Sequence, residues 1–351
     1  MIDEDLGVAN WLFLISAVVT VAYQLFFFFI AAAFRFDKVT DLAGGTNFVL
    51  VAVLCFCVGP ISQIPISISR RQWAVTLLVV LWGVRLSSFL FYRILVTSED
   101  SRFDGVRDNL LKFAGFWLGQ AVWVYVVSLP VMFVCGQTGD SAVELTAGDV
   151  AGWALAVLGL ILETVADNQK FSFRQRQARL AVKEPFIKTG VWRWSRHPNY
   201  CGELFVWWGI FISASQALTS TAQYFIILSP LLITYLLLGA SGMPILEQNA
   251  NKRLGRIPDY HLYRLETSPL FPLPNFLYRS LPPAIKRYVF FEWDLFARGL
   301  EDELSTDLLG SVLVDAAATR QLSTSGRTTS IASRTTSVTN SASVPFQTAS
   351  A

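Results

Sequence analysis

Residues 190–219 read GVWRWSRHPNYCGELFVWWGIFISASQALT, a polar stretch that passes directly into an apolar one. The polar part places Arg193, Arg196, His197 and Glu203 within about three helical turns at the edge of the apolar segment. Charged side chains are costly this close to lipid, and they usually persist there because they bind something. Two arginines and a histidine offer the forked donor surface that holds phosphate or carboxylate groups. The stretch therefore predicts a membrane helix with an anion-binding segment at its mouth.

The composition of the whole chain indicates a membrane protein. Of its 351 residues, 53% are hydrophobic and 15% are charged, against about 25% charged residues in soluble domains. Apolar windows close to the ~20 residues needed to cross a bilayer recur along the chain. We therefore expect an all-α, polytopic membrane protein with about seven transmembrane helices, over 8–33, 46–66, 73–96, 112–135, 148–167, 202–219 and 222–240. Pro60 and Pro65 interrupt the second window, which is expected to be kinked or partly re-entrant.

Positive charge predicts the orientation of these helices. The segment from Lys170 to Arg196 carries eight Lys or Arg residues, whereas none occurs between Phe113 and Gln169. The segment is therefore expected on the cytosolic side, with the N-terminus outside and the C-terminus in the cytosol. Counting spans backwards also places Arg35, Lys38, Arg93, Arg102, Arg107 and Lys112 inside. Arg70 and Arg71 break the rule, so either they snorkel at the outer interface or one early span is miscounted.

The chain divides into a membrane domain and a tail. Residues 1–300 are expected to form the membrane domain, with the signature and ligand-binding region at 160–275. Residues 301–351 form a cytosolic tail that is rich in Ser, Thr and Ala from about residue 322. This part cannot bury enough apolar surface to order itself and is expected to be disordered.

Metal binding is not expected. The four cysteines, Cys55, Cys57, Cys135 and Cys201, lack the spacing of metal ligands. His197 and His261 are the chain's two histidines, which excludes a histidine-rich site.

A second polar group of residues precedes the signature, at the end of the fifth apolar window. Glu163, Asp167, Lys170 and Arg174 are spaced i, i+4, i+7 and i+11, so on a helix they share one face. The spacing is compatible with a ladder of surface ion pairs worth a few tenths of a kcal/mol each. Two acids this close to an apolar span favour a functional role instead.

The signature segment also allows two interpretations, a ligand-binding helix start or an interfacial anchor. Asn199 and Glu203 share one helical face, and Pro198 suits the first turn of the helix. The helix N-terminus would then add its dipole to the positive field of Arg196 and His197. Alternatively, Trp192, Trp194 and Tyr200 form an aromatic belt, and the arginines meet lipid headgroups.

The motif Ser-Arg-His-Pro-Asn-Tyr followed by Gly-Glu resembles the C-terminal signature of membrane steroid 5α-reductases, sterol C=C reductases and enoyl-thioester reductases. It is most similar to their domain-of-unknown-function branch. The resemblance is specific at 190–203 and looser over about 40–275. It implies that Asp167 and Arg174, seven residues apart, bind a nicotinamide dinucleotide, with Glu163 one turn earlier. It also implies cofactor contacts for Asn199 and Glu203, and we expect Arg196, His197 and Tyr200 to bind the cofactor at the same site. Isoprenylcysteine carboxyl methyltransferases carry the related motif Arg-His-Pro-x-Tyr.

A third polar group follows in 242–269. Tyr260 and Tyr263 resemble a Tyr-x-x-Tyr element of both families that could close over an adenosine group, and Glu247 resembles an acid of the wider family. Ile245 and Asn249 replace an arginine and a histidine of the 5α-reductases, so this part of their phosphate-binding set is not kept here. A surface amphipathic helix is the alternative interpretation.

The catalytic acid is not evident from the sequence. Trp82 stands where the 5α-reductases carry the tyrosine that polarises the substrate ketone. Tyr92, Arg85 and Asp41 are the remaining candidates. Arg85 lies about two turns inside the third span and is expected to face a polar cavity.

The resemblance implies a membrane-embedded, NADPH-dependent reductase of a C=C bond in a lipid or steroid-like substrate. We expect a multi-pass protein of the bilayer, in the endoplasmic reticulum if the source is a eukaryote, that binds no nucleic acid. An S-adenosylmethionine-dependent membrane methyltransferase and a non-catalytic lipid-binding relative are the alternatives. The oligomeric state is not predicted.

Overall fold

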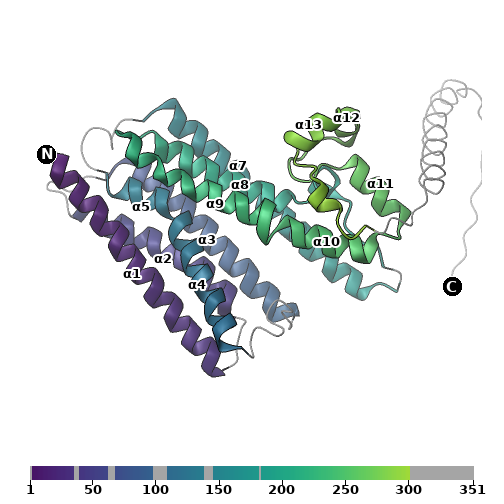
Figure 1. The fold of residues 1–351 in the computed structure, drawn as a ribbon, viewed down its shortest axis with the longest axis horizontal. Coiled ribbons are helices and arrows are strands. Elements are labelled where there is room, and N and C mark those ends of the chain that lie inside the picture. The colour runs from purple at the N-terminus through teal and green to yellow at the C-terminus, as the bar shows by residue number, and fades with distance from the viewer. Residues whose placement is uncertain are drawn as a thin grey trace, which may run out of the picture.

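The computed structural model describes residues 2–34, 39–61, 68–97, 109–137, 145–181 and 183–300. Within these ranges every regular element is a helix, and Figure 1 shows their arrangement. The long helices are α1 (Ile2–Phe34), α2 (Val39–Ile61), α3 (Arg70–Thr97), α4 (Leu110–Val127), α7 (Ala147–Arg179) and α8 (Pro198–Ser215). The shorter ones are α5 (Leu129–Cys135), η2 (Gly190–Arg193), η3 (Thr221–Ile227), α9 (Leu228–Tyr235), η4 (Leu236–Ala240), α10 (Met243–Leu254), α11 (Pro258–Glu266), α12 (Asn275–Ser280), α13 (Pro283–Tyr288) and η5 (Asp294–Ala297).

Six helical segments are long and apolar enough to cross a bilayer. They are Trp11–Phe34, Val39–Gly59, Arg70–Arg93, Leu110–Val127, Ala147–Arg179 and Thr221–Leu254. The protein is therefore an integral membrane protein with an all-helical fold. The expected sixth window, 202–219, falls mostly in α8, which is 18 residues long and is not among the six.

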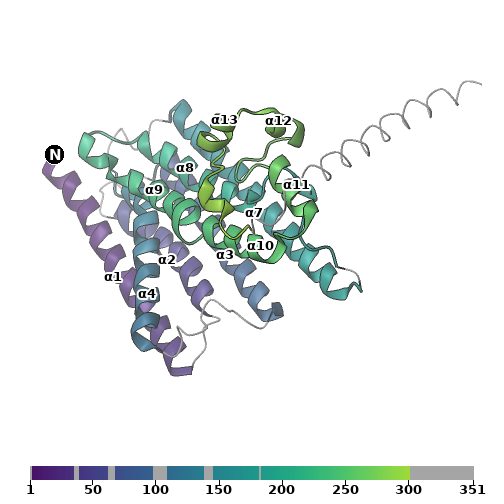
Figure 2. The same ribbon diagram turned by 45° about the vertical axis from the view of Figure 1, so that its right-hand side comes forward.

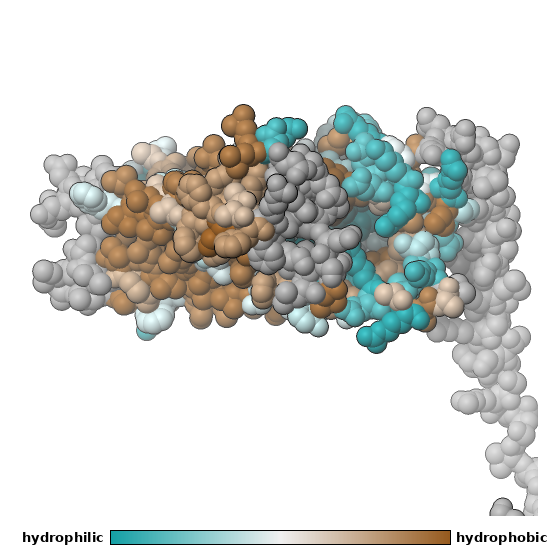
Figure 3. Space-filling view, turned by 90° about the horizontal axis from the view of Figure 1, so that it is seen from below, coloured by the Kyte–Doolittle hydropathy of each residue, from teal (hydrophilic) through white to brown (hydrophobic). Residues whose placement is uncertain are grey.

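The surface separates into an apolar and a polar end. In Figure 3, hydrophobic side chains gather over one half of the molecule and hydrophilic ones over the other. The helices α10 to α13 lie at the end remote from α1, as both ribbon views show (Figures 1 and 2). On α1, Trp11, Val18, Phe26 and Phe29 are exposed, as expected for a helix that faces lipid.

The helices α7 and α8 make the most extensive contact in the bundle because glycines let their backbones touch. A Cβ atom added to Gly159 would lie 2.4 Å from the carbonyl oxygen of Gly202. Similarly, a Cβ atom on Gly152 would lie 2.5 Å from the carbonyl oxygen of Gly209. Small residues allow this close approach between membrane helices. The pairing brings the acidic face of α7 against the signature at the start of α8.

Arg71, one of the two arginines that break the charge pattern, has a buried carboxylate partner. Its Nε and Nη2 atoms bind the two carboxylate oxygens of Asp149 at 2.7 and 2.8 Å, and both side chains are buried. Ser213 also donates a hydrogen bond to Asp149 at 2.8 Å. Arg71 therefore does not snorkel but joins α3 to the first turn of α7, whereas Arg70 is exposed.

Several expectations concern segments outside the described residues. These are the tail at 301–351, Pro65, and the cations Arg35, Lys38, Arg102 and Arg107 that entered the orientation argument.

Candidate functional site

The signature segment is fixed between α7 and the chain that follows α11. Trp192 donates its indole N–H to the carbonyl of Ala166 at 2.9 Å. The backbone N–H groups of Arg196 and His197 bind the carbonyls of Ser268 and Pro269 at 2.8 and 3.1 Å. The helix α8 then begins at Pro198, in its first turn as the sequence predicts.

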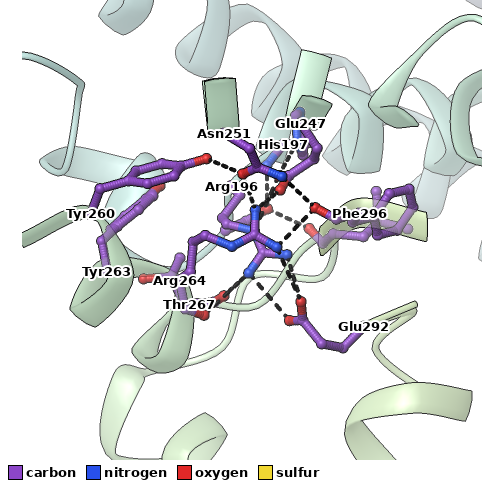
Figure 4. Close-up of polar contacts among 12 residues, drawn as sticks. Arg196, His197, Glu247, Asn251, Tyr260, Tyr263, Arg264, Thr267, Glu292 and Phe296 are labelled. Carbon is purple, nitrogen blue, oxygen red and sulfur yellow. Dashed lines mark hydrogen bonds and ion pairs between the residues drawn. The ribbon is translucent and has the colours of Figure 1, made fainter. Parts of the chain in front are cut away.

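Arg196 is the centre of a buried ion network, shown in Figure 4. Its Nε atom binds Glu247 at 3.1 Å, and its two terminal nitrogens bind the carboxylate of Glu292 at 2.8 and 3.2 Å. It also donates to the carbonyls of Arg264 and Thr267 at 3.1 and 3.3 Å. Burial opposes its charge, but the two carboxylates raise the pKa of Arg196 above its usual value. Each of its three nitrogens thus donates to a group of the protein, which is the pattern of a structural hub.

Glu247 connects this hub to His197. Its Oε1 atom lies 2.7 Å from His197 Nε2, and its other oxygen binds Arg264. Arg264 also binds Asn251 at 3.0 Å, and Tyr260 donates to the same amide oxygen at 2.9 Å. Glu247 and Tyr260 therefore belong to the network, although both also line a cavity.

A second polar cluster lies between α3, α7 and α8. Arg85 donates to Glu163 at 2.5 Å and to Asp167, and it also binds the carbonyl of Glu163 at 3.1 Å. The indole N–H of Trp82 donates to the other carboxylate oxygen of Glu163 at 3.1 Å. Glu203 interacts electrostatically with Arg85 and Asp167 but makes no hydrogen bond to the residues that the structure describes. We name these five residues the carboxylate cluster.

A cavity of about 410 Å³ opens where the signature meets α7, α10 and α11. We name it the signature cavity. Its wall includes four cations, four residues of the Arg196 network, four further aromatic side chains and one further carboxylate: Lys170, Arg174, Lys183, Arg253, Arg196, His197, Glu247, Tyr260, Phe173, Phe186, Trp192, Tyr263 and Glu184. Lys170 stacks 4.5 Å above the Trp192 ring, and Lys170, Arg174, Arg253 and Arg93 lie close enough to repel one another. Lys170, Arg174, Lys183 and Arg253 form no ion pair with a described carboxylate, and aromatic rings lie beside them. This combination suits a flat ligand that carries phosphate groups.

The predicted residues therefore divide into two neighbouring groups. The cavity is lined by Lys170, Arg174, Arg196, His197, Glu247, Tyr260 and Tyr263. Glu163, Asp167 and Glu203 lie in the carboxylate cluster. The Oδ1 atom of Asn199 is buried without a partner, and Tyr200 stacks on His197 at 5.6 Å. Tyr263 donates to the carbonyl of Trp192 at 2.7 Å.

The three catalytic candidates lie apart from one another. Arg85 is held by Glu163 and Asp167. Asp41 lies 3.6 Å from Arg93 at the end of α3. Tyr92 is 56% exposed and packs against Phe171, with ring centroids 5.5 Å apart.

Sequence reasoning missed Glu292 and the role of Trp82. Glu292 precedes η5, in a segment that carries no recognised motif, so nothing in the sequence connected it with Arg196. The resemblance identifies Trp82 as the replacement of a tyrosine. Its hydrogen bond to Glu163, which is 81 residues away in the sequence, could not be predicted from a local pattern.

A larger groove of about 670 Å³ lies beside α11, near Arg193, Trp194 and Phe276. Two of its cations are paired, Lys188 with Asp259 at 3.0 Å and Arg279 with Glu266 at 3.5 Å. We therefore place the functional site in the smaller cavity, where Lys170, Arg174, Lys183 and Arg253 form no ion pair with a carboxylate of the described residues.

Comparison with known proteins gives the family. Residues 27–267 match the family described as "Protein of unknown function (DUF1295)", and the chain belongs to it. A curated relative, "Uncharacterized protein C594.04c" of Schizosaccharomyces pombe, is 25% identical over 181 residues, which cover 44% of this chain and 52% of the relative. The chain thus spans about half the length of that relative. No solved structure matches the chain.

Proposed function

We propose that this DUF1295 protein is a membrane-embedded reductase that uses NADPH to reduce a C=C bond in a lipid or steroid-like substrate. The observation that carries the proposal is the signature cavity, whose unpaired cations lie next to the carboxylate cluster. The pyrophosphate and the 2′-phosphate of NADPH would neutralise Lys170, Arg174 and Arg253. S-adenosylmethionine carries no phosphate and has a positive sulfonium, so the same cations disfavour it.

The resemblance to steroid 5α-reductases supports the same ligand. The seven-residue interval between Asp167 and Arg174 is kept, and α7 places Arg174 at the cavity and Asp167 about two turns deeper in the helix. The nicotinamide would then extend from the cavity towards Asp167, Asn199 and Glu203. This direction leads from the polar end of the molecule into the apolar bundle, where a lipid substrate would lie.

NADPH supplies a hydride to the β-carbon of a polarised C=C bond, and the other carbon must receive a proton. Trp82 and Arg85 hold both oxygens of Glu163. Glu203 is the carboxyl group of the cluster that makes no hydrogen bond to the described residues, so it is the candidate for the proton donor. The proton is replaced from solvent, and each cycle consumes NADPH and one proton and yields NADP⁺ and the reduced lipid.

The proposed topology follows from the charge pattern. The Lys170–Arg196 segment supports a cytosolic cavity, an external N-terminus and a cytosolic C-terminus. In a eukaryote we propose the endoplasmic reticulum as the compartment. The cavity would then face the pool of soluble NADPH.

Thermal denaturation of the detergent-solubilised protein tests the ligand. A ligand at a hundred times its Kd stabilises the folded state by about 2.7 kcal/mol. NADPH should therefore raise the melting temperature, and S-adenosylmethionine should not. Arg174→Ala should reduce the response, whereas Arg176→Ala should keep it, because Arg176 is exposed on the same helix and does not line the cavity. Stabilisation by S-adenosylmethionine and not by NADPH would show that the protein is not this reductase.

A further inference from the structure

His197 lines the signature cavity and is 6% exposed. Its Nε2 atom lies 2.7 Å from Glu247 Oε1. That carboxylate is held by two arginines, so it can only accept a hydrogen bond, and Nε2 must carry the hydrogen. Burial lowers the pKa of His197 below its usual value and outweighs the pull of Glu247, so the ring is neutral at pH 7. Nδ1 is therefore a bare hydrogen-bond acceptor.

This acceptor is unused. Nδ1 is buried, and no donor among the described residues reaches it. The ring is held between the carboxylate at Nε2 and the Tyr200 ring, which stacks on it at 12°. Buried acceptors in proteins are almost always paired, so an unpaired one on a residue that lines a cavity points to a donor that comes from a ligand.

The neighbouring side chains define the shape of that ligand. Phe186 lies 5.5 Å from the Tyr260 ring and 5.2 Å from the Tyr263 ring, between ring centroids, and Trp192 stacks under Lys170. These aromatic walls suit a flat heterocycle. Both flat rings of NADPH carry an amino group, adenine on the ring itself and nicotinamide in its carboxamide. Nicotinamide must reach the lipid near the carboxylate cluster, which leaves adenine for the cavity.

We propose that Nδ1 of His197 accepts a hydrogen bond from the exocyclic amine of adenine, and that the Glu247–Arg196–Arg264 network keeps His197 in the tautomer that can do so. His197 would thereby select adenine over hypoxanthine, whose carbonyl oxygen at that position would face another acceptor. The choice of adenine over nicotinamide for this cavity rests on the proposed function. The contact itself also fits S-adenosylmethionine, which carries the same ring.

The test compares the Kd of NADPH with that of its hypoxanthine analogue, deamino-NADPH, by calorimetric titration of the full chain in detergent. One buried hydrogen bond between adenine and His197 predicts about 5- to 30-fold weaker binding of the analogue. His197→Phe keeps an aromatic ring but has neither ring nitrogen, and Glu247 keeps its bonds to Arg196 and Arg264. The ratio of the two Kd values should then fall to near one. His261→Phe is the matched control, because His261 bonds the carbonyl of Gly255 outside the cavity, and it should keep the full ratio.

Equal binding of the two dinucleotides to the wild-type protein would overturn the adenine contact, whatever the variants do. A ratio that persists in His197→Phe would assign the amine to another group. If NADPH does not bind but S-adenosylmethionine does, the proposed reductase is wrong, and the same comparison with S-inosylmethionine decides the role of His197. Failure of both ligands to bind the folded protein would overturn both proposals.

Discussion

Replacing Arg196 should destabilise the polar end of the molecule as well as weaken ligand binding. The signature suggests a phosphate-binding arginine, but Arg196 is 3% exposed in its side chain and binds two carboxylates and two carbonyls. Arg196→Ala leaves Glu292 with Tyr278 at 2.6 Å and with Arg264 at 3.9 Å, and it removes a donor from two backbone carbonyls.

The size of the effect follows from these contacts. Removing one partner of a buried ion pair costs about 3–5 kcal/mol. Glu292 is 29% exposed, so water can compensate part of its loss, and we take the lower end of the range, roughly 3 kcal/mol. At about 2–4 °C per kcal/mol for a chain of a few hundred residues, the melting temperature should fall by roughly 6–12 °C. Arg196→Lys should lose most of this stability as well, because an ammonium group cannot bridge Glu247 and Glu292.

Tryptophan fluorescence during heating in detergent, without ligand, is the assay. Arg253→Ala is the control, because Arg253 is an exposed cation of the same cavity without an ion pair to any described residue. It should melt within about 2 °C of the wild-type protein, since surface substitutions usually change stability by less than about 0.5 kcal/mol. If Arg196→Ala melts like the wild-type protein and only its response to NADPH is lost, Arg196 is a ligand residue and not a structural hub.

Three further predictions concern packing, the second buried pair and pH. A Cβ atom on Gly202 would lie 2.6 Å from Glu163 N, so Gly202→Ala should lower the free energy of unfolding by about 1–3 kcal/mol in a melting experiment. Gly119→Ala is the control and should leave the stability unchanged, because its Cβ atom would meet no atom within 4 Å. Asp149→Asn should lower the free energy of unfolding by about 3–5 kcal/mol, because it removes the carboxylate that pairs with buried Arg71. An unchanged melting temperature would show that the pair is not maintained in the membrane protein. Because the pKa of His197 is lowered on folding, the unfolded chain binds its proton more tightly, so stability should decline as pH falls through the ordinary value of 6.5. The slope should be smaller in His197→Gln, and an equal slope in both proteins would contradict a neutral, buried His197.

The membrane helices were predictable because each needs only a local run of apolar residues. Windows such as 73–96 and 148–167 fall within α3 and α7, and Pro198 marked the start of α8. The window 112–135 was drawn as one span, whereas the structure divides it into α4 and α5 at Ser128. Residue spacing also predicted that Glu163 and Asp167 would share a face, and Arg85 binds both.

The partners of the charged residues were not predictable from local patterns. Arg196 and Glu292 are 96 residues apart, and Arg71 and Asp149 are 78 residues apart. Spacing along one helix shows which side chains share a face but not which distant segment packs against that face. For the same reason the sequence suggested that Arg196 contacts the cofactor, whereas Arg253 emerges as a cation of the cavity wall only from the cavity that α10 lines together with α7 and α11.

Transfer of a labelled hydride tests most directly whether the protein is an NADPH-dependent lipid reductase. The purified protein would be incubated with a membrane lipid extract and NADPH that carries deuterium at the transferred position of the nicotinamide, and the lipids analysed by mass spectrometry. We expect a lipid that has lost one C=C bond and gained one deuterium from NADPH and one hydrogen from water, and we expect this product to be absent with Arg174→Ala. If NADPH leaves no deuterium in any lipid, while S-adenosylmethionine with a labelled methyl group does label one, the protein is a methyltransferase and the reductase proposal is wrong.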